Sequence, residues 1–182
     1  MRRLSASSWI FGPAISILFA AIFLLAYGGK LVNAADQDDP MPLIEPCELI
    51  SKVEAEDIMG ATLKEGQYSE NKTVGQKICL YEAADDDSIV FLQISLTQDA
   101  FMAPKVLESG QNAKAIFAST RDAFPDGERI GNIDDDAFIA PPGLHVLKGD
   151  YYLVIGAGNI QRNRLRLIAA GEKAVANLEA SM

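Results

Sequence analysis

The sequence predicts an α+β fold, in which a curved antiparallel sheet has helices packed on one face and an N-terminal signal or anchor helix precedes the domain. The segment 88–97 alternates apolar and polar side chains, as a strand with one buried face does. Several further short strand patterns follow between 128 and 155, with no helical pattern between them. Parallel strands need a crossover of a dozen or more residues, so these strands are expected to pair antiparallel.

The N-terminal segment 9–27 is a run of 19 residues without a charge, preceded by Arg2 and Arg3. A charged start, an apolar run and a small-residue exit are typical of a secretory signal peptide, here with cleavage after Ala34. The alternative is an uncleaved anchor, because about 28 Å of helix nearly spans the apolar core of a bilayer. In both cases the arginines stay inside and the rest of the chain crosses the membrane.

The chain is therefore divided into a signal peptide or membrane anchor (1–34), an acidic linker (35–45) and a single α+β extracytoplasmic domain (46–182). We expect this domain to be periplasmic or secreted, or tethered to the cytoplasmic membrane by the N-terminal segment alone. The formal net charge is −9 and becomes more negative once the leader is removed. An acidic domain repels nucleic acid and anionic lipid, so neither is a predicted partner.

Both cysteines, Cys47 and Cys79, lie in the exported part. A pair of cysteines in a small exported domain predicts a disulfide, and the long separation between the two excludes a CxxC redox motif. Lipidation of Cys47 is rejected because the preceding residues 44–46 do not form the processing signal and the apolar run ends well before them.

The first part of the domain is expected to form a short helix followed by a hairpin. Ser51 and Glu54 have the spacing of a capping box, and Gly60 supplies the left-handed residue that ends the helix. The strand patterns 77–83 and 88–97 are joined by a short aspartate-rich turn, which predicts a hairpin at the middle of the sheet.

The region 99–123 is expected to form two short helices. Asp99 can cap the region, Pro104 fits a first turn, and Gly110 interrupts the helical pattern. A turn at 124–127 then leads back to strands.

The C-terminal part is expected to add short strands and a final helix. The strand patterns occupy 129–133, 137–140, 144–147 and 151–155. The helix is predicted over 163–178, with an apolar stripe made of Leu165, Ile168, Val175 and Leu178. Gly171 and Ala174 lie beside this stripe, where the helix can approach the sheet closely.

Three local patterns carry a family resemblance. A cysteine opens a short helix that ends in glycine (47–60), Cys79 is followed by Tyr81 on the next strand, and the acidic stretch before Ala137-Phe138 leads to a Gly-Asp turn, a strand and a C-terminal helix. With these patterns the chain resembles small exported bacterial domains of unknown function, best known as actinobacterial lipoproteins. It departs from them by lacking a lipidation cysteine. The resemblance implies an α+β fold and a disulfide, and it implies no activity.

The sequence contains no recognisable catalytic or cofactor-binding set, so no catalytic residue, cofactor or metal ligand is predicted. The aspartate runs 85–87 and 134–136 lack the spacing of a calcium-binding EF-hand and are typical of solvated turns. The single histidine, His145, alternates with apolar residues on a strand, where we expect it to face solvent or make a hydrogen bond. The dense cationic cluster Arg162, Arg164 and Arg166 is a candidate anion contact, with surface pairing to the abundant acids as the alternative.

The sequence therefore favours a non-enzymatic extracytoplasmic binding or interaction domain, whose partner is an envelope protein or a small ligand. One alternative is a small envelope hydrolase that uses paired carboxylates such as Glu128 and Asp135. It requires a cleft with a carboxylate of raised pKa. Another alternative is a structural subunit of an envelope complex that uses the sheet face with Gln93 and Thr97, for which an exposed apolar patch would be the sign.

Overall fold

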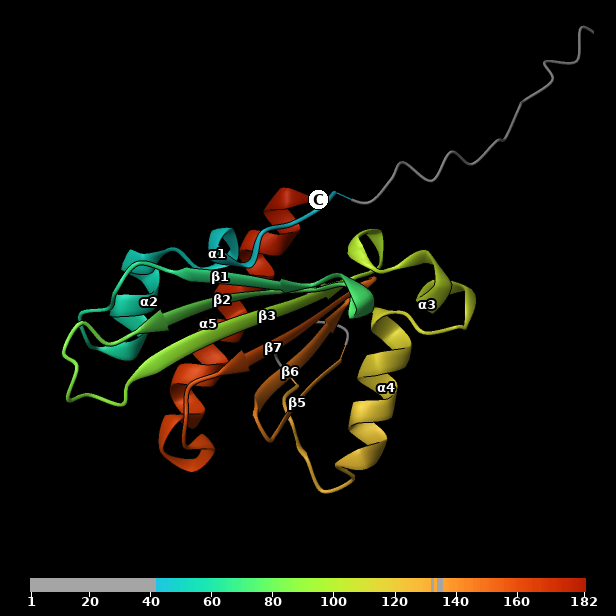
Figure 1. Cartoon of the computed structure of the whole chain (residues 1–182). Helices are drawn as coiled ribbons and strands as arrows, with labels where there is room; N and C mark the ends of the chain where they lie inside the picture. Colours follow the sequence, from blue (N-terminus) through green and yellow to red (C-terminus); the bar gives the residue numbers. More distant parts are fainter. Residues whose placement is uncertain (1–41, 132, 134–135) are drawn as a thin grey trace, which may run out of the picture. The chain divides into compact units, whose positions relative to one another are not determined.

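The computed structural model describes residues 42–131, 133 and 136–182, and these residues build a seven-stranded antiparallel sheet with helices packed on it (Figure 1). The strands are β1 (Gln67–Asn71), β2 (Gln76–Glu82), β3 (Phe91–Gln98), β4 (Glu128–Arg129), β5 (Asp136–Ala140), β6 (Gly143–Lys148) and β7 (Tyr151–Gly156). The helices are α1 (Pro46–Leu49), α2 (Lys52–Met59), α3 (Pro104–Glu108), α4 (Ala113–Ala123) and α5 (Ile160–Ser181), with short 3-10 turns η1 (Lys72–Val74) and η2 (Asp99–Phe101). The predicted α+β class and its antiparallel sheet are confirmed.

The strand order is β1-β2-β3-β7-β6-β5-β4, so two antiparallel meanders meet at the centre of the sheet. The first meander runs from β1 to β3 and the second returns from β4 to β7, with α3 and α4 between them. The β3–β7 pair joins the two, with Ile94 opposite Ile155 and Leu96 opposite Leu153. These four side chains are fully buried, which places the main core at this junction.

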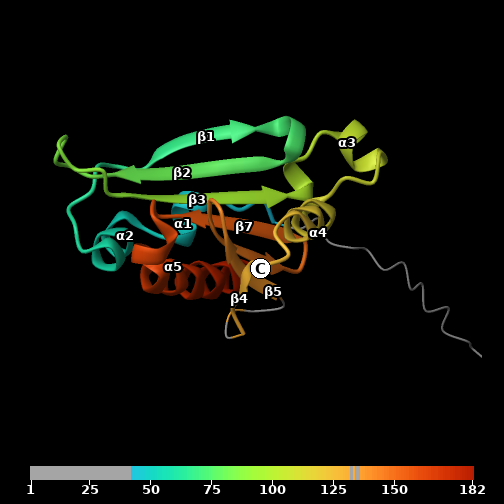
Figure 2. The same ribbon diagram turned by 90° about the horizontal axis from the view of Figure 1, so that it is seen from below.

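The first face of the sheet is covered by α1, α2 and α5 (Figure 2). Along α5, the buried residues are Leu167, Ala170, Gly171, Ala174, Val175 and Leu178. The predicted close approach at Gly171 is present, since a Cβ added there would lie only 2.3 Å from Leu144 Cδ2. The predicted stripe was wrong at Leu165, which is 76% exposed. It lies two residues from Leu167, more than half a helical turn away, so the two side chains point in opposite directions.

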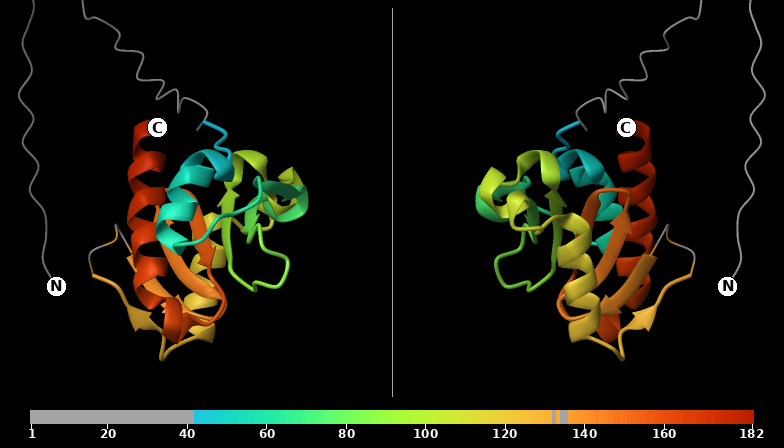
Figure 3. Two further views of the ribbon diagram at one scale, coloured as in Figure 1. Left: turned by 90° about the vertical axis from the view of Figure 1, so that its left-hand side faces the viewer. Right: turned by 90° about the vertical axis from the view of Figure 1, so that its right-hand side faces the viewer.

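The second face is covered by α4 over β6 and β7 (Figure 3). A smaller core forms there from Ala113, Phe117, Phe138, Ala140 and Tyr152. The Phe117 ring packs edge-on against Phe138 and Tyr152, at centroid distances of 5.5 and 5.4 Å. The helices therefore gather mainly on one face, and α4 adds a partial second layer that does not reach β1, β2 or the first residues of β3 on that side (Figure 1).

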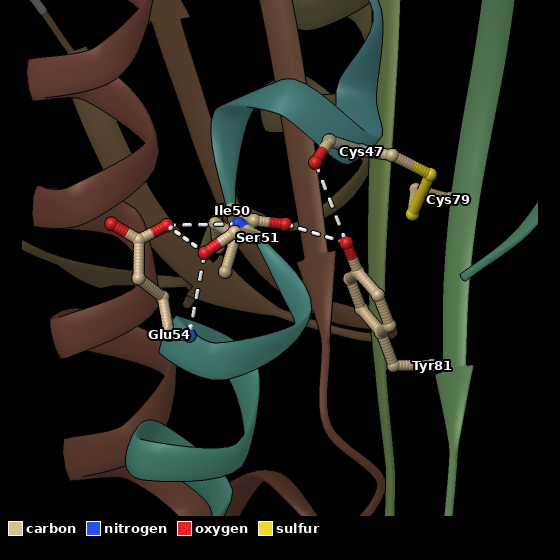
Figure 4. The surroundings of a disulfide bond; sticks show 6 residues. All are labelled: Cys47, Ile50, Ser51, Glu54, Cys79 and Tyr81. Carbon is tan, nitrogen blue, oxygen red and sulfur yellow. Dashed lines mark hydrogen bonds between the residues drawn. A yellow bond between two sulfur atoms is a disulfide. The ribbon is translucent and has the colours of Figure 1, made fainter. Parts of the chain in front are cut away.

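The Cys47–Cys79 disulfide is present, with a Cα–Cα distance of 5.2 Å, and it ties α1 to β2 (Figure 4). Beside it, the Tyr81 hydroxyl donates to the Ile50 carbonyl at 2.7 Å, between α1 and α2. Gly66 packs onto the bridge so closely that an added Cβ would lie 3.0 Å from Cys79 Sγ. The predicted capping box of Ser51 is also present, with Gly60 in the left-handed conformation at the end of α2.

The domain begins before the predicted boundary at 46. The Ile44 amide donates to Gln98 Oε1 at 2.9 Å, and Gln98 Nε2 donates back to the Ile44 carbonyl at 2.8 Å. The Tyr151 hydroxyl donates to the Pro42 carbonyl at 2.8 Å, and Glu45 pairs with the buried Lys77. The residues 42–45, which the predicted boundary placed in the linker, are held to one end of the sheet by side-chain bonds that no periodic pattern reveals.

Several helix and strand boundaries in the structure differ from the predicted ones. The strand β1 has no predicted counterpart, because all five of its residues are exposed at the edge of the sheet and the alternating pattern is therefore missing. The predicted strand at 129–133 is reduced to Glu128–Arg129, and α5 begins at Ile160 rather than at 163. The two predicted short helices after Asp99 are present as α3 and α4, separated at Gly110.

The predicted signal or anchor segment, 1–34, lies outside the described residues. Within the ranges that the structure describes, no helix has the length and apolar content that crossing a membrane requires.

Candidate functional site

A groove of about 420 Å³ lies where the first turn of α5 meets the chain between α4 and β4. Residues 123–128 line one side, 139–141 line another, and Ile160, Gln161 and Arg164 line the side formed by α5. Most of this lining is apolar, with a few polar groups at the rim. A largely apolar pocket with convergent polar groups is the usual form of a small-molecule site.

The turn 124–127 shapes one wall of the groove. Its end is closed by a hydrogen bond from the Gly127 amide to the Phe124 carbonyl at 3.0 Å. A Cβ added at Gly127 would lie 2.9 Å from Phe138 Cδ2 and 3.1 Å from the Phe124 carbonyl oxygen. The turn therefore needs glycine at this position to lie against β5.

The opposite wall is set by the start of α5. The Asn159 side chain accepts a hydrogen bond from the Arg162 amide, which fixes the first turn of the helix. With the helix starting at Ile160, residues 160, 161 and 164 fall on the side that faces the groove. Residues one turn apart on a helix share a face, which is why Arg164 lies beside Ile160.

The main polar feature of the groove is an ion pair between α5 and β4. Arg164 Nε donates to both carboxylate oxygens of Glu128, at 2.9 and 3.1 Å, and an Nη of the same guanidinium also bonds Oε1. The hydrogen bonds from Arg164 lower the pKa of Glu128, and those to Glu128 raise the pKa of Arg164. Both side chains are partly exposed, at 41% for Arg164 and 48% for Glu128, so water reaches the pair.

The three predicted arginines do not converge. Arg164 alone lines the groove, whereas Arg162 is exposed on another side of the helix. The Arg166 guanidinium bonds Asn163 Oδ1 at 2.9 Å and lies near Gly60 at the end of α2. Alternate residues on a helix point about 200° apart, so Arg164 points away from Arg162 and Arg166, which are one turn apart.

The carboxylate pair considered for a hydrolase is only partly described. Glu128 is bonded to Arg164, and its pKa is lowered by that contact. A general acid needs a carboxylic acid of raised pKa, which is the opposite direction. The second member, Asp135, lies outside the described residues.

His145 is buried beneath α4, with 1% of its surface exposed. Its Nδ1 lies 2.7 Å from the Tyr152 hydroxyl, and its Nε2 lies 3.2 Å from the Ala140 carbonyl. Since a carbonyl only accepts, the neutral ring carries its proton on Nε2 and accepts at Nδ1. Burial lowers the pKa of His145, and the stacked Phe138 ring at 4.6 Å contributes to that burial. The alternative of a solvent-facing histidine is therefore wrong, and the hydrogen-bonded one is confirmed.

Among the described residues, no group of three or more histidine, cysteine, aspartate or glutamate side chains is arranged to hold a metal ion. The aspartates 134 and 135 are outside those residues. In the other run, Asp85 Oδ1 accepts from the Asp87 amide at 3.1 Å, which is the expected role of aspartate in a turn.

Sequence reasoning missed the Glu128–Arg164 pair and the groove beside it. The signal that was available is the asparagine at 159, an N-cap residue that places the helix start three residues earlier than predicted and so brings Ile160 and Gln161 into the helix beside Arg164. No protein-family model, curated protein or solved structure matches this chain.

Proposed function

We propose that this protein is a non-enzymatic extracytoplasmic binding domain that holds a small anionic ligand in the groove at the start of α5. The observation that carries the proposal is the Arg164 guanidinium at the rim of an apolar groove, with Glu128 as its present partner. In this proposal Glu128 occupies the place of the ligand's carboxylate or phosphate. The ligand's apolar part then lies along Ile139, Pro141 and Ile160.

The exchange of Glu128 for a ligand anion requires little free energy. An exposed ion pair of this kind contributes little to stability, because water and salt screen both charges. Burial of about 100 Å² of apolar ligand surface contributes about 2.5 kcal/mol, which exceeds the loss. The apolar floor therefore supplies most of the affinity, and Arg164 selects for negative charge.

An extracytoplasmic location is part of the proposal. It is supported by the Cys47–Cys79 disulfide, because such bridges persist in oxidising compartments, and by the apolar leader of the sequence. Whether the domain is released or remains tethered depends on cleavage after Ala34. N-terminal sequencing of the protein isolated from its native membrane or medium distinguishes the two forms.

The binding test uses phenylacetate and octanoate as anionic probes, with phenylacetamide and octanol as neutral counterparts of similar shape. We expect the carboxylates to shift the amide NMR signals of residues 124–128 and 160–164 and to bind more tightly than the neutral probes. Arg164→Gln should weaken carboxylate binding about tenfold, the loss of one charge-assisted hydrogen-bonding partner. Glu128→Gln should strengthen binding severalfold, because it removes the competing carboxylate.

The matched control is Arg162→Gln, which removes the same charge from an exposed position outside the groove. It should leave both affinities unchanged. Equal affinity for the carboxylates and their neutral counterparts, or an equal effect of the two arginine substitutions, would overturn the proposal.

A further inference from the structure

A second surface, separate from the groove at α5, lies at the end of the sheet where β2 turns into β3. The link between these strands, 83–90, projects from the end of the sheet (Figure 1). Beside it is a hollow of about 470 Å³, lined by Leu80, Phe91 and Gln93 from the uncovered second face and by residues of the link. We name this the hairpin surface and define it as Leu80, Glu82, Asp85, Asp86, Ile89, Phe91 and Gln93.

Ile89 is the most unusual residue of the hairpin surface. It is 94% exposed, although isoleucine is among the residues most often buried in folded proteins. The link is held in a defined shape by hydrogen bonds from the Ser88 amide to the Asp85 carbonyl at 3.0 Å and from the Ala83 amide to the Val90 carbonyl at 2.9 Å. Ile89 is therefore presented outward by an ordered turn, and its side chain contributes nothing to the stability of the domain.

The strands next to the link continue the apolar surface. Ile78 and Leu80 on β2 and Phe91 on β3 are only half-buried on the second face, where α4 does not reach. The Phe91 ring lies beside Gly156 and Gly158, since a Cβ added at these positions would be in ordinary contact with it at 3.9 and 3.6 Å. An apolar strip thus extends from the tip of the hairpin along the face of the sheet.

The rim of the hairpin surface is acidic. Glu82, Asp85 and Asp86 line the hollow, and Asp87 follows directly in the link. Lys64 is the one basic residue among the lining residues, and its Nζ bonds Asp86 at 2.7 Å. The carboxylates of the rim therefore outnumber the cations that the same surface supplies.

We propose that the hairpin surface docks a basic, apolar segment of a partner protein. The partner's apolar side chains cover Ile89 and Phe91, and its lysine or arginine side chains meet the acidic rim. The choice of partner follows from charge. A second copy of this chain brings a net charge of −9 against an acidic rim, and an anionic lipid surface is repelled in the same way. A cationic segment is attracted by the rim and covers the apolar strip as well.

The test uses the full-length chain and three synthetic peptides of equal length: one that alternates lysine with leucine and valine, one that replaces lysine with glutamate, and one that replaces the apolar residues with serine. We expect the basic apolar peptide to bind measurably, with affinity that falls as salt is added, and the other two to bind at least tenfold more weakly. The amide NMR signals of residues 85–93 should shift on binding.

The decisive variant is the double substitution Asp85→Asn with Ile89→Ser, which should weaken binding by at least about tenfold because it removes both kinds of contact. Both residues lie in an exposed link, so the domain stays folded. The matched control is Asp57→Asn with Val53→Ser, which removes one acid and one exposed β-branched residue from α2.

The control should leave the affinity unchanged. If both double variants weakened peptide binding equally, the affinity would depend only on the net charge of the protein, and this result would overturn the proposal. So would self-association of the full-length chain that the Asp85→Asn, Ile89→Ser variant abolishes, because it would identify a second copy as the occupant.

Discussion

Removal of the Cys47–Cys79 disulfide gives the sharpest prediction for stability. The bridge joins residues 32 positions apart, and closing a loop of that length in the unfolded chain is worth about 3.7 kcal/mol in the chain-entropy model. This is a large share of the 5–15 kcal/mol by which typical domains are stable. For a domain of this size, the same loss corresponds to a decrease of about 13 °C in the unfolding midpoint.

The assay is urea unfolding of the oxidised protein and of the Cys47→Ala, Cys79→Ala variant, under identical conditions. The variant should lose about 3.7 kcal/mol, with the chain-entropy model as the source of the magnitude. The reduced wild-type protein should behave like the variant, because both lack the same cross-link. A free energy of unfolding of the variant within about 1 kcal/mol of that of the oxidised protein would refute the reasoning. It would mean that the unfolded chain gains little conformational entropy when the bridge is lost.

The companion substitution Tyr81→Phe separates the bridge from its surroundings. It removes the hydrogen bonds from the Tyr81 hydroxyl to the carbonyls of Ile50 and Cys47 while the ring remains against Gly66 (Figure 4). The loss should be about 1 kcal/mol, the net value of a buried hydrogen bond. A loss comparable to that of the cysteine variant would show that the position of α1, rather than chain entropy, carries the stability.

Two further predictions concern the two faces of the sheet. Gly171→Ala should destabilise the domain by about 1–3 kcal/mol in urea unfolding, because the new Cβ meets Leu144 Cδ2 at 2.3 Å in a filled core. The control Gly131→Ala should leave the stability unchanged or slightly higher, because the space around Gly131 is open. Burial lowers the pKa of His145 in the folded state, so the unfolded state takes up a proton first as the pH falls below about 6.5, and the free energy of unfolding should decrease there by at most about 1.4 kcal/mol per pH unit. His145→Gln should remove this decrease between pH 7.5 and the folded-state pKa, and parallel curves for the two proteins would contradict the assignment.

Local patterns predicted much of this fold because several of its elements have strong local signals. The capping box at Ser51 and the alternation along β3 each depend on neighbouring residues only, and both are present in the structure. The turn at 124–127 is also local, and it now forms one wall of the groove.

The missed features depend on distant partners. The Gln98 side-chain amide bonds both the backbone amide and the backbone carbonyl of Ile44, as a neighbouring strand would. The two residues are 54 positions apart, and no pattern around either residue reveals this contact. The Glu128–Arg164 pair spans 36 residues in the same way. The edge strand β1 has no buried face, so its sequence lacks the alternation by which strands are recognised. The candidate site was therefore predictable only as a cluster of three arginines, and the sequence did not indicate that Arg164 is the one that faces the groove.

The composition of β2 bears on why half of the second face is left uncovered. An antiparallel strand with one solvent-exposed face usually alternates apolar and polar residues. In β2, Cys79 and Tyr81 fill the first face, and the second face carries Ile78 and Leu80 between the polar Gln76 and Glu82. The middle of the strand is therefore apolar on both sides, although the described helices cover only its first side. The disulfide, the bonds of residues 42–45 and α5 all act on the first face, whereas the core under α4 on the second face lies over β5, β6 and β7 and does not extend to β2. In this part of the sheet Ile78, Leu80 and Phe91 stay only half-buried and Ile89 is 94% exposed, and this is the apolar surface on which the proposed docking depends.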